Sequence, residues 1–339
     1  MIIFDTETTG LDSAINNICQ LSYIKVYDFE RSKPMEICSA KNFFFTVDYV
    51  EPGAEKVHGL SIDKLRELSK CKRFKDFAEE IYEDFKNEDI LCGHNVDFDI
   101  GFLIKELDEA GYAARDLLYK KRFCTMHSYT DILCLNWNDY YHEYKWPRLS
   151  EVVDYLSRVV DFIVPDKKYK EYKEYLEDKT KEIFNLDENV DFHDARLDVT
   201  TTREIALIYR NICGDLIFKD DDYDYGHKSF YFKRMLVLPK NPYYKSLIYT
   251  LGINRVCREH SRQIISIKNS RIDTDCSIKP DCLTNGYGWM TGSTRRTVEI
   301  AFDLFNGFKP EEPETLTYLL GYNGEDTKYY IEALKLRFL

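Results

Sequence analysis

The chain has 339 residues, which exceeds the usual length of one compact domain and favours two. Hydrophobic residues make up 44% of it and charged residues 31%, a balance that permits a buried core and excludes a chain disordered throughout. The net charge is −12, and no apolar run approaches the roughly 20 residues that cross a bilayer, so we expect no membrane insertion.

The charge is unevenly distributed. Between Gly226 and Glu299 there are thirteen Lys or Arg against five Asp or Glu, which gives +8 and leaves −20 for the remainder. Such a basic segment favours contact with nucleic acid, which Lys and Arg drive. The acidic remainder is compatible with a phosphodiester substrate if divalent metal ions neutralise the phosphate, so carboxylates are expected as metal ligands.

Two features bear on where the protein works. Its ten cysteines lie at irregular spacings in a long chain. Met1 leads directly into an apolar strand-like stretch, which leaves no room for a signal peptide. We therefore expect reduced cysteines and a cytoplasmic location.

The first part of the chain alternates strand and helix patterns. Stretches rich in Ile, Val, Phe, Cys and Tyr predict strands at residues 1–6, 18–27, 42–47 and 90–92. Apolar residues at helical spacing predict helices at 76–85, 98–110, 149–156 and 195–212. The highly charged stretch at 169–183 is expected to be a solvated inserted helix. This order indicates an α/β domain.

The basic segment predicts a second, smaller α/β domain. Its patterns favour strands at 230–238 and 246–252, then helices at 255–267 and 294–305. The acidic run KDDDYD is a linker. The predicted division is a first domain at 1–213 with a charged helical insertion near 157–190, an acidic linker at 214–228 and a basic domain at 229–339.

Two carboxylates stand two residues apart in FDTETTG. Asp5 and Glu7 follow the apolar start of a strand, whose alternating side chains place both acids on one face. An isolated D-x-E is more often a strand end with exposed acids. In a buried strand unpaired acids are costly, so a bound cation is expected here.

Two later elements carry further acids. In GHNVDFDIGFL, Asp99 lies near the start of a predicted helix, where an acid also stabilises the helix dipole without any catalytic role. In HDARLD, His193 and Asp198 are five residues apart at the start of the last helix of the domain. A histidine at such a place is more often structural, so the hypothesis rests on the whole set.

The order and context of these elements resemble the DEDDh (DnaQ-like) 3′-5′ exonucleases over residues 1–213. DTETTG is similar to the first family motif, HNVDFD to the second and His-x-x-x-x-Asp to the third. VHGL at 57–60 and KWPRLSE at 145–151 are similar to further segments of the family. The resemblance implies an RNase H-like fold, a mixed central sheet flanked by helices. The charged insertion before His193 departs from the family pattern.

The resemblance also implies a mechanism. Two Mg²⁺ or Mn²⁺ ions are expected on Asp5, Glu7, Asp99 and Asp198, and oxygen ligands favour these ions over zinc. His193 is the expected general base, since histidine has an ordinary pKa of about 6.5. By resemblance, Thr8 and His58 contact the terminal nucleotide; their alternative roles are turn capping and surface packing.

The basic region resembles a BRCT domain, from YTLG at 249–252 to a final helix near 314–320, although the usual paired glycines are absent. The predicted nucleic-acid contacts are Arg255, Arg295 and Arg296. A dimerisation element and an unrelated α/β module are the alternatives. Zinc on Cys257, His260, Cys276 and Cys282 is the less favoured hypothesis, because the last gap is wider than zinc sites usually have.

The leading functional hypothesis is an exonuclease that trims single-stranded DNA from its 3′ end. A 3′-5′ exoribonuclease is the enzymatic alternative, because no residue reports contact with a 2′ hydroxyl. A catalytically silent nucleic-acid-binding protein is the alternative from another class, and the complete set of four acids and one histidine argues against it. A polymerase or repair protein is the partner expected at the C-terminal domain.

Overall fold

The computed structural model describes residues 1–27, 35–164, 169, 171–187, 190–219, 226–269, 274–311, 321 and 324–339. The chain forms two compact units. The N-terminal unit comprises Met1–Tyr129, Trp146–Arg158 and Lys168–Ile208, and the C-terminal unit comprises Thr130–Lys145, Val159–Lys167 and Tyr209–Leu339. The domain bounds expected from the sequence stay predictions. No helix in the described ranges is long and apolar enough to cross a membrane.

The N-terminal unit is built on a five-stranded mixed sheet in the order β3-β2-β1-β4-β5. β2 pairs antiparallel with both β1 and β3, whereas β4 pairs parallel with β1 and β5 pairs parallel with β4. The strands are β1 (Ile2–Thr8), β2 (Ile18–Val26), β3 (Ile37–Phe44), β4 (Ile90–Gly93) and β5 (Lys121–Cys124). This sheet confirms the predicted α/β fold class.

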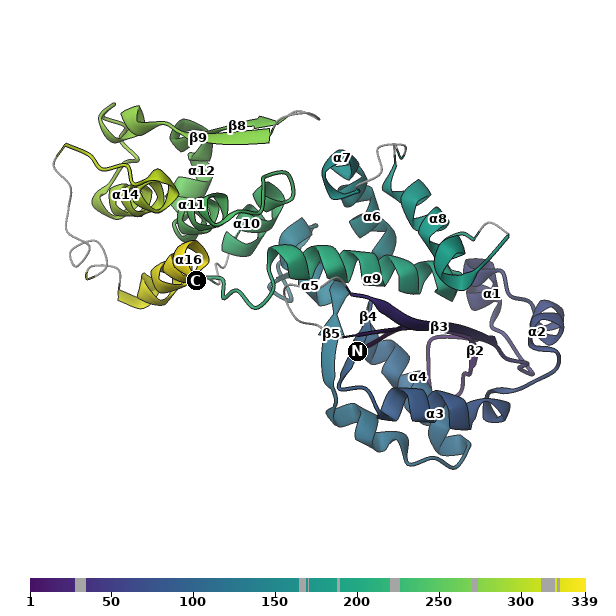
Figure 1. The fold of residues 1–339 in the computed structure, drawn as a ribbon. Coiled ribbons are helices and arrows are strands. Elements are labelled where there is room, and N and C mark those ends of the chain that lie inside the picture. The colour runs from purple at the N-terminus through teal and green to yellow at the C-terminus, as the bar shows by residue number, and fades with distance from the viewer. Residues whose placement is uncertain are drawn as a thin grey trace. The chain divides into compact units, whose positions relative to one another are not determined.

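Helices cover both faces of this sheet (Figure 1). The helices expected from apolar spacing and from the charged stretch correspond to α3, α4, α6, α8 and α9. The helical elements that begin in this unit are α1 (Pro52–His58), α2 (Ile62–Ser69), η1 (Phe74–Asp76), α3 (Ala78–Lys86), α4 (Val96–Glu109), η2 (Ala114–Tyr119), α5 (Thr125–Leu133), α6 (Leu149–Ser157), α8 (Tyr172–Phe184) and α9 (Ala195–Ile212).

β1 separates two apolar clusters. Phe4 packs in a cluster that contains α4 residues, including Leu103, while Ile3 packs with Val199 of α9. Because side chains alternate along a strand, the even-numbered residues of β1 face α4 and the odd-numbered ones face α9. This alternation decides which helix each polar residue of β1 meets.

The C-terminal unit is mainly helical in its described part. α11, whose residues 246–253 are all buried, contacts α10, α14 and α16. The elements of this unit are β6 (Trp137–Asn138), β7 (Glu143–Tyr144), α7 (Val160–Ile163), α10 (His227–Met235), α11 (Pro242–Ile253), α12 (Arg255–Glu259), α13 (Ser261–Ile264), β8 (Ile265–Asn269), β9 (Thr274–Ile278), η3 (Pro280–Leu283), α14 (Gly292–Asn306), η4 (Gly324–Asp326) and α16 (Thr327–Phe338).

Several expectations for this region are wrong. The predicted strands at 230–238 and 246–252 lie in or after α10 and in α11. A continuous apolar run does not separate a buried strand from a buried helix, and here packing on several sides favours the helix. The predicted helix at 255–267 breaks into α12 and α13 and ends in strand β8, whereas α14 confirms the helix expected at 294–305.

The resemblance to a BRCT domain stays unconfirmed. Its expected first strand ends at 249–252, and those residues lie inside α11. The final helix expected at 314–320 lies outside the described residues. The described part of the second domain holds helices and two separate two-stranded ribbons, β6-β7 and β8-β9.

His227 fixes α10 against α11. Its fully buried imidazole accepts a hydrogen bond from the Lys219 backbone N–H at Nδ1 (3.2 Å), so Nε2 carries the proton and donates to the Tyr249 carbonyl (2.8 Å). A Cβ at Gly252 would collide with this ring, which explains the glycine. Burial lowers the pKa of His227 to about 3, so the ring is neutral near pH 7.

Candidate active site

Acidic side chains gather around β1 and the start of α9. Asp5 and Glu7 occupy odd-numbered positions of β1 and therefore face α9, where Asp198 lies in the first turn. Burial raises the pKa of Asp5 and of Glu7 well above the usual value, and the charges of Asp198 and Asp99 raise both further. The predicted shared face of the two β1 acids is thus confirmed.

Asp99 is held from the other face of the same strand. α4 begins just before it, after Asn95 in the left-handed conformation (φ 75°). Thr6 donates to Asp99 Oδ1 through its backbone N–H (3.1 Å) and its hydroxyl (2.6 Å). Burial nevertheless raises the pKa of Asp99 to about 7, although the Thr6 bonds favour the charged form.

Only one of the two carboxylate oxygens of Asp198 is hydrogen-bonded among the described residues. The backbone N–H of His193 donates to Asp198 Oδ2 (3.2 Å), and His193 adopts the left-handed conformation (φ 68°) that this contact accompanies. Asp198 Oδ1 is buried and has no hydrogen-bond partner among the described residues. Burial raises the pKa of Asp198 to about 7.

These features fit a divalent cation. One ligand atom each of Glu7, His193 and Asp198 lies within 4.8 Å of the others, the sole such group of three or more His, Cys, Asp or Glu in the described ranges. A buried oxygen without a partner is costly unless a ligand satisfies it. Crowded buried carboxylates need either protons or a cation, and hard oxygen donors suit Mg²⁺ or Mn²⁺.

The two residues expected to contact a nucleotide lie at the same end of β1. The Thr8 hydroxyl donates to the Gly10 carbonyl (2.8 Å), which is the turn-capping alternative. His58 ends α1, and its Nδ1 accepts from the Leu60 N–H (3.0 Å). Burial lowers the pKa of His58, and neighbouring His193 lowers it further. His58 thus lies near the acids, and nucleotide contact by either residue stays a prediction.

Sequence reasoning missed the residues that hold the start of α9. Gln20 of β2 donates to Asp194 (3.0 Å) and accepts from the Ala195 N–H (3.4 Å). Burial alone would raise the pKa of Asp194, but the bonded Arg196 guanidinium lowers it below its ordinary value. The adjacency of Asp194 to His193 was the available signal, whereas nothing in the sequence pointed to Gln20.

Comparisons with known proteins agree with this arrangement. Residues 2–127 match the RNase T exonuclease family, and this stretch carries the first two acidic motifs. The chain is 33% identical over 115 residues to the epsilon subunit of DNA polymerase III from Buchnera aphidicola subsp. Acyrthosiphon pisum. Residues 2–127 are a DnaQ-like exonuclease domain. The third motif, at His193 and Asp198, lies beyond the matched stretch and joins the domain through the fold.

The exonuclease domain has further relatives. PolC-type DNA polymerase III of Latilactobacillus sakei subsp. sakei is 32% identical over 124 residues. That alignment covers 34% of this chain and 7% of the PolC-type protein. The alignment with the Buchnera subunit covers 32% of this chain and 44% of the subunit, so the chain spans less than half of either relative.

The C-terminal segment matches a different family. Residues 216–339 match a family of unknown function (DUF6075).

The fold also has a distant likeness among solved structures. The zinc-bound complex of Escherichia coli exonuclease I with single-stranded DNA has a TM-score of 0.43 and 18% identity, covering 62% of this chain and 40% of that one. Exonuclease I without a ligand gives a TM-score of 0.40. These values are too low for a functional conclusion.

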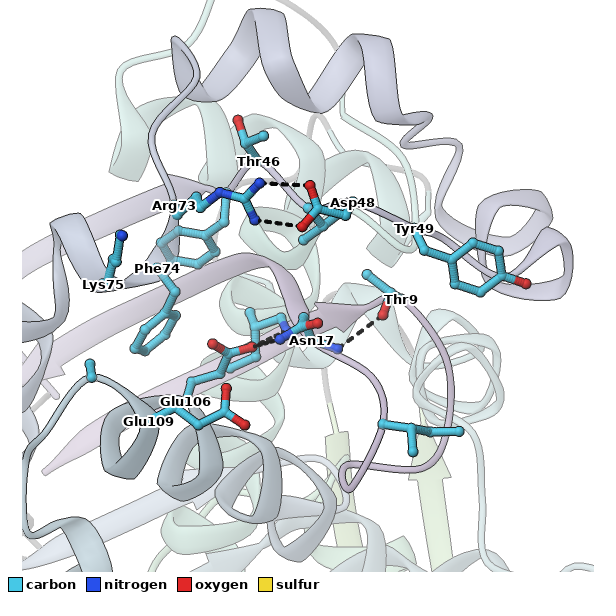
Figure 2. A pocket seen from close by; sticks show the side chains of 15 residues that line it. Thr9, Asn17, Thr46, Asp48, Tyr49, Arg73, Phe74, Lys75, Glu106 and Glu109 are labelled. Atoms are coloured by element: carbon cyan, nitrogen blue, oxygen red, sulfur yellow. Dashed lines mark hydrogen bonds and ion pairs between the residues drawn. The ribbon is translucent and has the colours of Figure 1, made fainter.

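A hollow of about 300 Å³ lies beside the exonuclease domain's first motif (Figure 2). Most of its charged groups are already partnered: Arg73 binds Asp48 through two bonds (2.6 and 3.0 Å). Glu106 accepts from the Asn17 side chain (2.9 Å) and from the Ile18 N–H (3.0 Å). None of the predicted catalytic residues lines this hollow, so it is separate from the acidic cluster.

The predicted basic contacts of the C-terminal unit are mostly balanced by acids. Arg255 pairs with Glu259 (2.8 Å) and Arg295 with Glu299 (2.7 Å), each one turn along its own helix. Arg296 is half-buried. The zinc hypothesis finds no support here either, since the His260 ring stacks on Trp289 with centroids 4.5 Å apart.

Proposed function

We propose that this chain is a metal-dependent 3′-5′ exonuclease that releases nucleotides from the 3′ end of single-stranded DNA. One observation carries the proposal: inside a DnaQ-like domain, Asp198 presents a buried oxygen without a partner beside Glu7 and His193. A merely structural carboxylate at this depth would have both oxygens satisfied. The complete set of acids also argues against a catalytically silent binder.

The four acids divide the work of holding metal. Asp5, Glu7, Asp99 and Asp198 would hold two Mg²⁺ or Mn²⁺ ions, which supply charge neutralisation and electrophilic stabilisation of the phosphate. Thr6 orients Asp99, and the His193 backbone N–H orients Asp198. Asp99 and Asp198 therefore enter the reaction already positioned, which lowers the entropic cost of reaching the transition state.

His193 is the proposed general base. Its side chain is exposed, so the imidazole can exchange protons with solvent between turnovers. It would accept the proton of a water whose oxygen attacks phosphorus while the bond from phosphorus to the 3′ oxygen breaks, and the leaving 3′ oxygen would take a proton from solvent. The products are a nucleoside 5′-monophosphate and a strand with a new 3′ hydroxyl.

Single-stranded DNA is the proposed substrate because both sequence relatives are DNA polymerase III proteins. The basic C-terminal segment would supply affinity for the strand; of the contacts expected from the sequence, Arg255 and Arg295 are balanced by acids, and Arg296 stays a prediction. A polymerase or repair protein as partner of this segment, and a cytoplasmic location, stay predictions.

The test is the product pattern from end-labelled strands. A 5′-labelled DNA strand and the RNA strand of the same sequence are incubated with the full chain and Mg²⁺ or Mn²⁺, with EDTA as control. The expected result is a ladder that shortens from the 3′ end of DNA, with mononucleotides released. Faster shortening of RNA would assign the exoribonuclease alternative, and intact strands under all conditions would refute the proposal.

A further inference from the structure

A second concentration of charge lies in the C-terminal unit. A hollow of about 340 Å³ is bounded by side chains of α10, α13 and β8. Three of the six lining residues are cations and none is a carboxylate; they are Lys233, Arg234, Ser261, Arg262, Ile265 and Ile267. We call this group the cationic hollow.

Arg234 is the fixed cation of the cationic hollow. Its guanidinium lies 3.5 Å from the centroid of the Phe230 ring and donates to the Ser261 hydroxyl (2.9 Å) and the Phe230 carbonyl (3.4 Å). Both acceptors are uncharged. The guanidinium is therefore oriented by a ring and a hydroxyl, while these contacts leave its positive charge unbalanced.

The neighbouring cations Lys233 and Arg262 interact with Arg234 through their charges. Burial, with a smaller contribution from the charge of Arg262, lowers the pKa of Arg234 to about 10, while Cys276 acts in the opposite direction. Burial also lowers the pKa of Lys233, and Arg234 contributes in the same direction. A neighbouring cation that lowers the pKa of another contributes a positive potential, and an anion is the group that such a potential attracts.

The β8-β9 hairpin turns its acid away from this hollow. Ile267 lines the hollow and lies opposite Cys276, so these two share one face of the hairpin. Lys268 and Asp275, one residue further along each strand, point to the other face. There the Asp275 carboxylate accepts from the Tyr244 hydroxyl (2.7 Å). Asp275, the acid in the described part of the hairpin, therefore does not neutralise the cations of the hollow.

We propose that the cationic hollow binds a backbone phosphate of a single-stranded nucleic acid. The use of a strand as ligand rests on the proposed exonuclease function. Guanidinium groups match the geometry of phosphate oxygens, and the Ser261 hydroxyl is a further donor. The aliphatic Ile265 and Ile267 supply an apolar wall against which a sugar packs.

Aromatic rings continue from the edge of the hollow. His260, directly before Ser261 in the chain, stacks on Trp289 with centroids 4.5 Å apart and planes 3° apart, and Trp289 stacks on Tyr287 at 5.3 Å. All three rings are half-buried, so part of this stack is open to solvent. Cations beside stacked aromatic rings are typical of surfaces that bind unpaired strands. This neighbourhood favours a strand over a free phosphate ion.

The experiment measures binding of a fluorescently labelled oligothymidylate by the full chain. All proteins carry Asp99→Asn and EDTA is present, so the strand stays intact. Arg262→Gln and Lys233→Gln are each expected to weaken binding about fivefold and to reduce the slope of log affinity against log salt by about 0.7. The matched control is Lys268→Gln, which removes the same charge from the opposite face of the hairpin and is expected to change affinity less than about twofold.

The outcomes separate the possible ligands. Competition with thymidine 5′-monophosphate or inorganic phosphate at equal phosphate concentration is expected to displace far less probe than unlabelled strand. The proposal would be overturned if Lys268→Gln and Arg262→Gln lost equal affinity for the strand. It would also be overturned if neither Arg262→Gln nor Lys233→Gln lost affinity while melting temperatures stayed unchanged, or if inorganic phosphate alone displaced the probe. Because binding is measured without hydrolysis, failure of the exonuclease assay would be a distinct result.

Discussion

The two units bury ionisable groups with opposite outcomes. In the N-terminal unit burial raises the pKa of Asp99 and Asp198 to about 7, and in the C-terminal unit burial lowers that of His227 to about 3. Both shifts follow from the cost of burying charge. The difference lies in the partners: both nitrogens of His227 are bonded, whereas Asp198 Oδ1 has no partner among the described residues. Burial by itself is thus no sign of function, and the unsatisfied carboxylate oxygen beside Glu7 and His193 is what distinguishes this site.

The largest expected effect is on the acids. Asp99→Asn and Asp198→Asn should each reduce nucleotide release about 10³-fold or more, because several kcal/mol of charge stabilisation by metal is lost. Initial rates on end-labelled DNA measure this loss. The matched control is Asp97→Asn, an exposed acid of the same helix that pairs with Arg122, whose rate should be unchanged within about twofold. A folded Asp99→Asn protein with near-normal activity would contradict the assignment.

The next effect concerns proton transfer. His193→Ala should lose about 10²- to 10⁴-fold in rate, the range typical of a general base, while still binding metal. The acid limb of the pH-rate profile should disappear with the side chain. Added imidazole is expected to restore part of the rate, because a free base can replace the missing one. An unchanged pH profile would place the base elsewhere.

The acids also predict how metal-free stability depends on pH. Their folded pKa values near 7 exceed the ordinary value of about 4, so between these limits the folded state binds more protons and stability falls as pH rises. Relative to Asp198→Asn, the wild-type melting temperature in EDTA should therefore fall from pH 4 to pH 8, and Mg²⁺ or Mn²⁺ at pH 8 should reverse that fall. Asp198→Asn should reduce both the pH slope and the metal response. If Asp198→Asn kept the pH slope of the wild type, the protonation of Asp198 would not be the cause of the fall in stability.

His227 predicts the opposite sign in the C-terminal unit. Its folded pKa of about 3 lies below the ordinary value of about 6.5, so the unfolded state binds more protons as pH falls between them, and stability is lost on acidification. His227→Gln keeps a donor for the Tyr249 carbonyl and an acceptor for the Lys219 N–H without a titrating group. Relative to His227→Gln, the wild-type melting temperature should therefore fall from pH 7 to pH 4.5. An equal loss would contradict this role.

The smallest effect is expected at the paired arginines. Arg255→Gln and Arg295→Gln should each weaken single-strand binding less than about twofold, because Glu259 and Glu299 already balance these charges. The salt dependence of oligothymidylate binding measures this, beside the larger change expected for Arg262→Gln. A loss at Arg255 that equals the loss at Arg262 would show that ion pairing does not decide which cations contact the strand.

The sequence by itself determined most of the N-terminal unit. The positions of β1, β2 and β4 and of α4 and α9 were predictable because their apolar spacing is local. The shared face of Asp5 and Glu7 was predictable because alternation along a strand is local too. The pairing of Arg255 with Glu259 was also readable, since residues four apart on a helix are neighbours.

Only the tertiary structure decided the contacts between distant segments. Thr6 reaches Asp99 across 93 residues and Gln20 reaches Asp194 across 174, separations that leave no local pattern. α11 was misassigned because an apolar run fits a buried strand and a buried helix equally, although Asn241 as N-cap and Pro242 after it pointed to a helix. The cationic hollow likewise depends on α10 meeting α13, because composition gives the number of cations and packing decides which of them stay unbalanced.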